Sequence, residues 1–172
     1  MNLALSAGEK IHIVGRNGSG KSTLLKLTAL QKQQPLDQIF LARNCFYLDQ
    51  NFSFLNEALS AIENLRQMNP DIPEVKWCNL LGQLRIRGDK GTYPLPQLSG
   101  GEKLKVALLG LSQVSPQPEL LLLDEPENHL DIESKASLAS AIRSYKGAMM
   151  LVSHDEQFVR DCGITEVFNM NE

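Results

Sequence analysis

Residues 11–22 read IHIVGRNGSGKS, and this stretch decides the fold class. Its first four residues form the apolar run of a buried strand, and a helical pattern follows it through Leu30. Between the two, residues 15–22 fit the pattern GxxxxGK[ST] of a phosphate-binding loop. Glycines let such a loop wrap until its N–H groups point at phosphate oxygens, and the helix adds its positive N-terminal end. The stretch therefore predicts a strand, a phosphate-binding loop and a helix, in that order.

The residue types in this loop suit the phosphates of a nucleotide. Lys21 is expected to reach the β- and γ-phosphates, and the Ser22 hydroxyl is expected to sit on Mg²⁺. The alternative is a chance glycine turn, but a random match is expected in only about one such chain in a hundred. The predicted phosphate-binding residues are Gly15, Asn17, Gly18, Ser19, Gly20, Lys21, Ser22 and Thr23.

Further apolar runs without polar alternation occur later in the chain. They comprise residues 45–48, 120–123 and 148–152. Uniformly apolar runs are typical of parallel strands that are covered on both faces. In open α/β sheets, ligands sit beyond the carboxyl ends of the strands. Here those ends carry Gln50, the pair Asp124-Glu125, and His154. The sequence therefore predicts an α/β fold with a mainly parallel sheet and one ligand site at its carboxyl edge.

Asp124 and Glu125 are the chemically most suggestive pair. Two adjacent carboxylates at a strand end are costly unless a cation or water occupies the site. Asp124 is placed to hold Mg²⁺, directly or through water, and Glu125 to orient or deprotonate an attacking water. A turn or helix cap at Asp-Glu-Pro is the alternative, and the phosphate-binding loop makes it the less favoured one. By the same logic His154 is expected to bond the γ-phosphate, and Gln50 to serve the metal and the water, although a histidine there can also be a capping residue.

Between residues 51 and 97 the pattern becomes helical. Residues 56–66 and 74–84 carry apolar side chains at helical spacing, and prolines punctuate the segment. We expect an α-helical subdomain at about residues 51–112, inserted into a single domain that covers residues 1–172.

The pentapeptide LSGGE at residues 98–102 allows two interpretations. Ser99 and Glu102 form a capping box at the start of a helix expected over residues 100–111. The box does not explain Gly100 and Gly101, which weaken the first turn by about 1 kcal/mol each relative to alanine. Two glycines are expected where something approaches the backbone closely, and the bare N–H groups of a helix N-terminus suit phosphate. The residues alone leave both interpretations open.

Composition and charge exclude several classes of protein. The 172 residues are 42% apolar and 22% charged, with a net charge of -3, so no electrostatic sign of a nucleic-acid surface exists. No apolar run approaches the roughly 18 residues of a spanning helix, and no signal peptide precedes the first strand. Cys45, Cys78 and Cys162 form no metal-like pair and are expected to be reduced structural thiols. We expect a soluble, cytoplasmic domain without membrane insertion.

Together these motifs resemble the ATP-binding cassette (ABC) family, over nearly the whole chain. In chain order they are similar to its Walker A loop (residues 15–22), Q-loop (Gln50), signature (residues 98–102), Walker B strand with catalytic glutamate (residues 120–125), D-loop (residues 128–131) and switch histidine (His154). The resemblance implies a P-loop NTPase with a RecA-like core, an antiparallel β edge and an inserted helical subdomain. It also implies Mg-ATP hydrolysis by a head-to-tail pair of cassettes. Ser99, Gly100 and Gly101 would cap the γ-phosphate bound by the partner's Walker A loop.

Within the family, residues 124–131 (DEPENHLD) and 100–103 (GGEK) are similar to the ABC-F branch. Those proteins carry two cassettes in one chain, lack membrane domains and act on ribosomes. The implied partners are a second cassette, as the upstream half of the same chain or as a homodimer, and a ribosome or tRNA. The branch usually has threonine where this chain has Glu127.

Two other functions compete with this interpretation. One is the nucleotide-binding subunit of a membrane transporter, whose helical subdomain would dock on a membrane protein. The other is a small-molecule kinase of another P-loop family, which the signature and His154 disfavour.

The N-terminus departs from the family pattern. Cassettes usually begin about two strands earlier, with an aromatic residue that stacks on adenine, and residues 1–10 contain no aromatic side chain. We therefore expect a C-terminal cassette with truncated N-terminal strands, or a divergent short one, and weak discrimination between ATP and GTP.

Overall fold

The computed structural model describes residues 5–30, 44–86 and 88–170. These residues divide into two compact units. The sheet unit consists of the described residues of Met1–Asn51, Pro118–Asn128 and Lys135–Glu172. The helical unit consists of those of Phe52–Gln117 and His129–Ser134.

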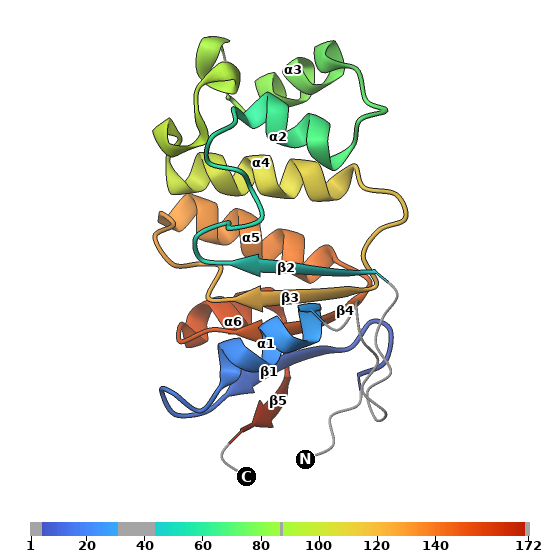
Figure 1. Ribbon diagram of the computed structural model, residues 1–172. Coiled ribbons are helices and arrows are strands. Elements are labelled where there is room, and N and C mark those ends of the chain that lie inside the picture. The colour runs from blue at the N-terminus through green and yellow to red at the C-terminus, as the bar shows by residue number, and fades with distance from the viewer. Residues whose placement is uncertain (1–4, 31–43, 87, 171–172) are drawn as a thin grey trace. The chain divides into compact units, whose positions relative to one another are not determined.

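A five-stranded parallel sheet forms the centre of the sheet unit (Figure 1). Its strands are β1 (Lys10–Val14), β2 (Cys45–Asp49), β3 (Leu120–Asp124), β4 (Ala148–Val152) and β5 (Glu166–Asn169). They lie in the order β2-β3-β4-β1-β5, with every neighbouring pair parallel. This arrangement confirms the predicted α/β fold class and the first four strands. The sequence did not predict β5, because Val167 is exposed on this short edge strand and the apolar run is therefore weak.

Helices cover both faces of this sheet. Helix α1 (Lys21–Leu30) inserts Leu25 into an apolar cluster with Ile11 and Ile13 of β1 and Leu122 of β3. Helices α5 (Ile132–Ser144) and α6 (Glu156–Cys162) lie on the other side of the sheet from α1 (Figure 1). Because β3 and β4 are buried along their whole length, they carry the uniform apolar runs seen in the sequence. This layering leaves the carboxyl ends of the strands open to a ligand.

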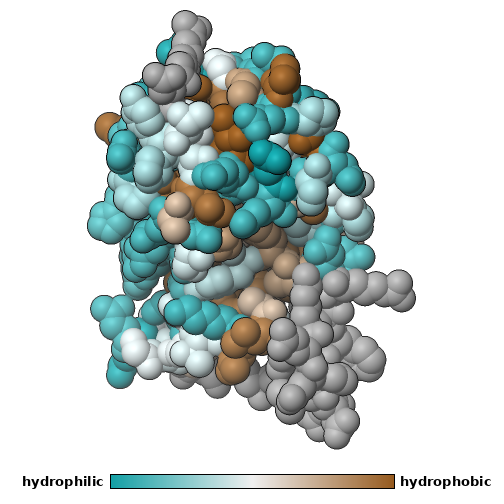
Figure 2. Space-filling model, turned by 45° about the horizontal axis from the view of Figure 1, so that its top comes forward, coloured by the Kyte–Doolittle hydropathy of each residue, from teal (hydrophilic) through white to brown (hydrophobic). Residues whose placement is uncertain are grey.

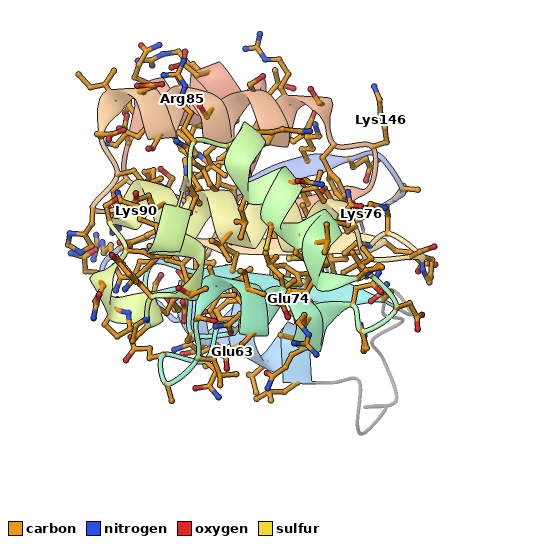
Figure 3. All side chains as sticks on the ribbon, turned by 90° about the horizontal axis from the view of Figure 1, so that it is seen from above. Glu63, Glu74, Lys76, Arg85, Lys90 and Lys146 are labelled. Atoms are coloured by element: carbon orange, nitrogen blue, oxygen red, sulfur yellow. The ribbon has the colours of Figure 1, made fainter. Side chains whose placement is uncertain are left out.

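The helical unit contains α2 (Ala61–Met68), α3 (Glu74–Gln83) and α4 (Gly100–Ser112). Short 3-10 turns, Gly88–Thr92 and Leu95–Gln97, join α3 to α4. The fully buried Trp77 and Leu81 of α3 anchor its core. Figure 3 shows α2 and α3 with the charged residues Glu63, Glu74 and Lys76 labelled.

The predicted helix at residues 56–66 is wrong at its start. Ser60 caps α2: its hydroxyl accepts the Glu63 N–H at 3.2 Å, and the Glu63 carboxylate accepts the Ser60 N–H at 2.7 Å. Asn64 then holds the preceding segment, because its side chain bonds the backbone N–H and C=O of Asn56. A capping box therefore ends the apolar pattern that the sequence suggested was continuous.

Large apolar side chains are exposed at scattered positions. On the face in Figure 2, hydrophobic residues occur in groups among hydrophilic ones. The exposed large apolar residues are Leu27, Leu30, Val75, Tyr93, Ile132 and Val167. Among the described residues, no helix has both the length and the apolar character needed to span a membrane.

The three cysteines all lie in the described parts of the chain, and none forms a disulfide. Cys162 is buried in α6, and burial raises the pKa of its thiol to about 12. Such a thiol stays protonated and unreactive, in agreement with a structural role.

Candidate functional site

The loop between β1 and α1 has a backbone that requires glycine. Gly18 and Gly20 have φ angles of 79° and 92°, in the left-handed region that side chains disfavour. A Cβ on Gly15 would lie 2.7 Å from the Ser19 hydroxyl, so that a side chain there would force Ser19 to move. Lys21 is 8% exposed, and its Nζ donates to the carbonyl oxygens of Gly15 at 2.8 Å and Arg16 at 3.1 Å. The loop thus curls around its own ammonium group.

Asp124 ties this loop to two strands. Its Oδ1 accepts a hydrogen bond from the Ser22 hydroxyl at 3.0 Å, and its Oδ2 accepts one from the Tyr47 hydroxyl at 2.9 Å. Burial, together with the hydrogen bond to Asp124, raises the pKa of Tyr47 well above its ordinary value. The sequence reasoning missed Tyr47. Its signal was the strand period, because Tyr47 pairs in register with Leu122 and so shares a face with Asp124.

These oxygens suit a hard divalent cation. Mg²⁺ is usually bound by one or two protein oxygens and completes its shell with waters and substrate phosphates. Ser22 and Asp124 supply such a pair beside the loop. In the described part of the chain, no group of three or more His, Cys, Asp and Glu side chains could hold a metal ion without such outside ligands.

Glu125 is held from several directions. It has a φ of 49°, a strained conformation that costs roughly 1–3 kcal/mol and persists only where the surrounding structure enforces it. Its N–H donates to the carbonyl of Val152, the last residue of β4, at 2.9 Å. Its Oε1 lies 3.4 Å from His154 Nε2, and its Oε2 accepts the Asn128 amide at 2.6 Å. The enforced backbone aims the carboxylate between His154 and Asn128.

Gln50 joins the same group through Asn128. The Asn128 amide donates to Gln50 Oε1 at 3.1 Å as well as to Glu125. Gln50 is therefore linked through Asn128 to Glu125, the predicted water-activating residue. Asn128 was predicted only as part of a motif, and its bridging contact became visible in the tertiary structure.

A cavity of about 490 Å³ opens over the loop, within the size range of small-molecule sites. It brings together most of the predicted phosphate-binding residues with Glu125 and His154, two of the three predicted catalytic side chains; Gln50 does not line it. Its lining residues are Asn17, Gly18, Gly20, Lys21, Ser22, Thr23, Glu125 and His154.

The predicted capping box at Ser99 is present at the start of α4. The Ser99 hydroxyl accepts the Glu102 N–H at 3.2 Å, and Glu102 Oε2 accepts the Ser99 N–H at 3.0 Å. Lys90, labelled in Figure 3, contacts Glu102 Oε1 at 2.6 Å. This ion pair and the bonds from Ser99 lower the pKa of Glu102. The charged box stabilises the helix start.

Packing inside the helical unit explains why glycines follow Ser99. A Cβ on Gly100 would lie 3.0 Å from the carbonyl oxygen of His129, and one on Gly101 would overlap the Ser134 hydroxyl. The close approach that the glycines predicted is therefore made by a segment of this chain. Ser99, Gly100 and Gly101 belong to the helical unit, whereas all residues that line the cavity belong to the sheet unit.

Fold and site together define a P-loop nucleotide-binding domain. A family model described as "ABC transporter" matches residues 1–128. The chain belongs to this family, that of the ATP-binding cassettes, as its motifs predicted.

Curated relatives indicate which branch of the family this chain resembles. The chain is 37% identical over 163 residues to the probable ATP-binding protein YheS of Escherichia coli K12. The aligned residues cover 93% of this chain and 25% of that protein. It is 37% identical over 164 residues to human ATP-binding cassette sub-family F member 3, covering 93% and 23%. The predicted similarity to the ABC-F branch is thus confirmed. The chain spans about a quarter of the length of these relatives.

Solved structures agree on the fold. The structure titled "Dimeric Structure of MJ0796, a Bacterial ABC Transporter Cassette" matches with a TM-score of 0.69 at 23% identity, over 93% of this chain and 81% of that one. A post-hydrolysis dimer of the same cassette, bound to ADP and Pi, matches with a TM-score of 0.66. The chain is an ABC ATPase domain by family and fold.

Proposed function

We propose that this domain binds Mg-ATP in the cavity over the Walker A loop and hydrolyses it in a head-to-tail pair of cassettes. The observation that carries the proposal is the convergence of Lys21, Ser22, Asp124, Glu125 and His154 at one edge of the sheet. The post-hydrolysis dimer of a similar cassette with ADP and Pi supports it.

Binding follows from the loop. Phosphate oxygens would replace the carbonyls of Gly15 and Arg16 as acceptors for the Lys21 ammonium. The N-terminus of α1 adds N–H groups and a positive dipole end. Ser22 and Asp124 would hold Mg²⁺, which would offset the negative charge of the phosphates. Gln50 is a candidate further ligand on the water side of the site.

Hydrolysis follows from Glu125. Its carboxylate faces the cavity, where it can accept a proton from a water aligned with the γ-phosphate. His154 lies beside it and can donate a hydrogen bond to the γ-phosphate. Asn128 and Gln50 fix the other side of the carboxylate. Each group thus has an orienting neighbour.

The second cassette would complete the site. Ser99, Gly100 and Gly101 start α4 with N–H groups that suit phosphate, and the ABC resemblance implies that they face a partner's nucleotide. The helical subdomain that carries them would be the Phe52–Gln117 part of one cassette domain.

Measuring phosphate release together with Mg-ATP affinity distinguishes an effect on hydrolysis from an effect on binding. We expect Glu125→Gln to bind Mg-ATP within about twofold of the wild-type affinity while releasing phosphate more than roughly 100-fold more slowly, as loss of a general base predicts. Glu156→Gln, a highly exposed glutamate in α6, is the control and should change neither quantity. Unchanged turnover in Glu125→Gln would refute the assignment of Glu125.

The ABC-F resemblance implies work on ribosomes as part of a two-cassette protein. We expect the full-length protein that contains this domain to sediment with ribosomes in Mg-ATP when Glu125 is replaced by Gln, and to leave them with ADP. Recovery with an integral membrane protein would instead favour the transporter alternative.

A further inference from the structure

Glu127 is a buried acid that the proposed mechanism does not use. It lies three residues beyond β3, and it is 2% exposed. Its Oε1 accepts a hydrogen bond from the Ser153 hydroxyl at 2.5 Å. Its Oε2 is buried and has no hydrogen-bond partner among the described residues. A carboxyl group buried with one oxygen unsatisfied destabilises the fold, so a compensating role is expected.

Ser153 is the point where this acid meets the switch loop, which we define as residues 153–155. The Ser153 hydroxyl donates to Glu127 and accepts the Asp155 N–H at 3.0 Å. Its carbonyl oxygen lies 3.0 Å from the His12 ring nitrogen of β1. Asp155 in turn binds Lys135 of α5 at 3.0 Å. The switch loop is therefore held from β1, from the segment after β3, and from α5.

His154 depends on these neighbours for its position. Its side chain is 57% exposed and lies 3.4 Å from Glu125. An exposed imidazole is not confined by packing, so the backbone of the switch loop decides where it points. Ser153 supplies the side-chain anchor immediately before it.

We propose that Glu127 is a positioning residue: through its hydrogen bond to Ser153 it fixes the switch loop so that the His154 imidazole lies beside Glu125. The inference rests on the proposed roles of Glu125 and His154. It gives a role to Glu127, the position at which the ABC-F branch usually has threonine.

Two other roles for Glu127 fit the structure less well. A second general base would need access to water, and the carboxyl group is buried. A fixed negative charge is also disfavoured, because burial raises the pKa of Glu127, and the charges of Asp155 and Glu125 add to the rise against the opposing bond from Ser153. Hydrogen-bond acceptance is the property that remains, and glutamine retains it.

Three substitutions and one control separate these roles. Glu127→Ala and Ser153→Ala each remove one partner of the bond, and Glu127→Gln keeps an acceptor of the same shape. Thr28→Ala is the control: Thr28 is 9% exposed, and its hydroxyl donates to the Leu24 carbonyl at 2.8 Å within α1. It removes a comparable buried hydrogen bond from the same unit without touching the switch loop.

The first readout is the imidazole of His154 in proton–nitrogen correlation spectra of the nucleotide-free chain. The chain has three histidines, so each signal can be assigned with a His→Gln variant. We expect the His154 signals to shift in Glu127→Ala and Ser153→Ala, and to stay in place in Glu127→Gln and Thr28→Ala. His129, which belongs to the helical unit, is an internal control.

The second readout is ATP turnover. We expect kcat to fall about tenfold or more in both alanine variants, with KM for Mg-ATP changed by no more than about twofold. Glu127→Gln should restore kcat to within about twofold of the wild type. The double alanine variant should be no worse than the poorer single variant, because both remove the same contact.

The outcomes are decisive in both directions. Unmoved His154 signals in both alanine variants would overturn the proposal, as would a loss in Glu127→Gln equal to that in Glu127→Ala. An equal kcat loss in Thr28→Ala would show that any buried hydrogen bond matters as much. If the wild-type chain does not hydrolyse ATP at all, the proposed function fails, while the imidazole signals still test the positioning contact.

Discussion

Lys21 shows how one residue can serve folding and binding with the same atom. Its ammonium is nearly buried and donates to two carbonyls of the loop that it follows. Those carbonyls hold the nitrogen where phosphate oxygens would otherwise be its acceptors. Residue-scale predictions therefore have to separate effects on stability from effects on ligand binding.

Lys21→Ala is expected to weaken Mg-ATP binding more than about tenfold. A charge-assisted contact to phosphate contributes about 1.5–3 kcal/mol, and tenfold in affinity corresponds to about 1.4 kcal/mol. Calorimetric titration with Mg-ATP measures the change. Lys26→Ala, on the exposed side of α1, is the matched control and should bind normally. Equal affinity in both variants would mean that the loop does not bind phosphate.

Glu127→Gln is expected to change how stability depends on pH. Burial raises the pKa of Glu127 in the folded state above its unfolded value. Its stabilising contribution is therefore complete below the unfolded pKa and is lost as pH rises through the folded pKa. Relative to wild type, Glu127→Gln should gain stability as pH rises from 5 to 8, by at most about 1.4 kcal/mol per pH unit.

Chemical denaturation of both proteins across that pH range measures the difference. Two parallel stability curves would contradict the buried, perturbed state of Glu127. A difference in stability already present at pH 5 is compatible with it, provided that the difference changes with pH, because the amide and the carboxyl group differ in hydrogen bonding.

At the scale of elements, the first turn of α4 contains residues that stabilise the helix and residues that weaken it. The capping box and Lys90 stabilise the first turn, while Gly100 and Gly101 weaken it. The glycines let residues 129–134 approach closely, so the contact between segments outweighs local helix propensity.

Gly101→Ala is expected to destabilise the chain by about 1–2 kcal/mol, because the new Cβ would overlap the Ser134 hydroxyl. Gly82→Ala is the control: Gly82 lies in α3, and a Cβ there meets nothing within 4 Å. That substitution should stabilise by up to about 1 kcal/mol. Urea denaturation compares the two variants. A stabilised Gly101→Ala would argue that the glycine pair is kept for a ligand and not for packing.

At the scale of the whole molecule, the chain matches only part of the length of its curated relatives. It spans about a quarter of the related chains YheS and ABC sub-family F member 3. ABC cassettes bind ATP and dimerise, and a similar cassette has been solved as a dimer. A second cassette, in the same chain or another copy, is the expected partner.

Glu125→Gln should trap an ATP-dependent dimer of this domain. Glutamine keeps the size of the side chain but cannot take a proton from water, so bound ATP persists. Since ligand shifts association by mass action, the dimer should grow with Mg-ATP concentration and not with Mg-ADP. Sedimentation velocity measures it. A monomer at every ATP concentration would exclude the homodimer and leave pairing with an unlike cassette.

Adding Ser99→Arg tests the signature in that dimer. An arginine side chain at Ser99 should abolish the dimer, while binding of Mg-ATP to the monomer stays within about twofold. Persistence of the dimer in the double variant would show that Ser99 is only a helix cap.

The sequence by itself determined the class of fold and predicted which side chains lie at the carboxyl edge of the sheet. Glycines at positions 18 and 20, a lysine at 21 and uniform apolar strands each follow from a local requirement: positive φ, a cation in the loop, burial on both faces. A local requirement constrains the residue types within a few positions of it, so the sequence alone can indicate it. The order of motifs then identified the family.

Only the tertiary structure decided which of these residues touch. Tyr47 meets Asp124 across 77 positions, Asn128 joins Gln50 to Glu125, and Glu127 meets Ser153 across 26. The segment that excludes a side chain at Gly100 and Gly101 also lies about thirty positions away. Such contacts are set by strand order and by the packing of whole elements. The partner of each residue lies far from it in the sequence, so the local sequence does not indicate which residue it will contact. That is the physical reason why the sequence predicted the catalytic groups but not the contacts that hold them.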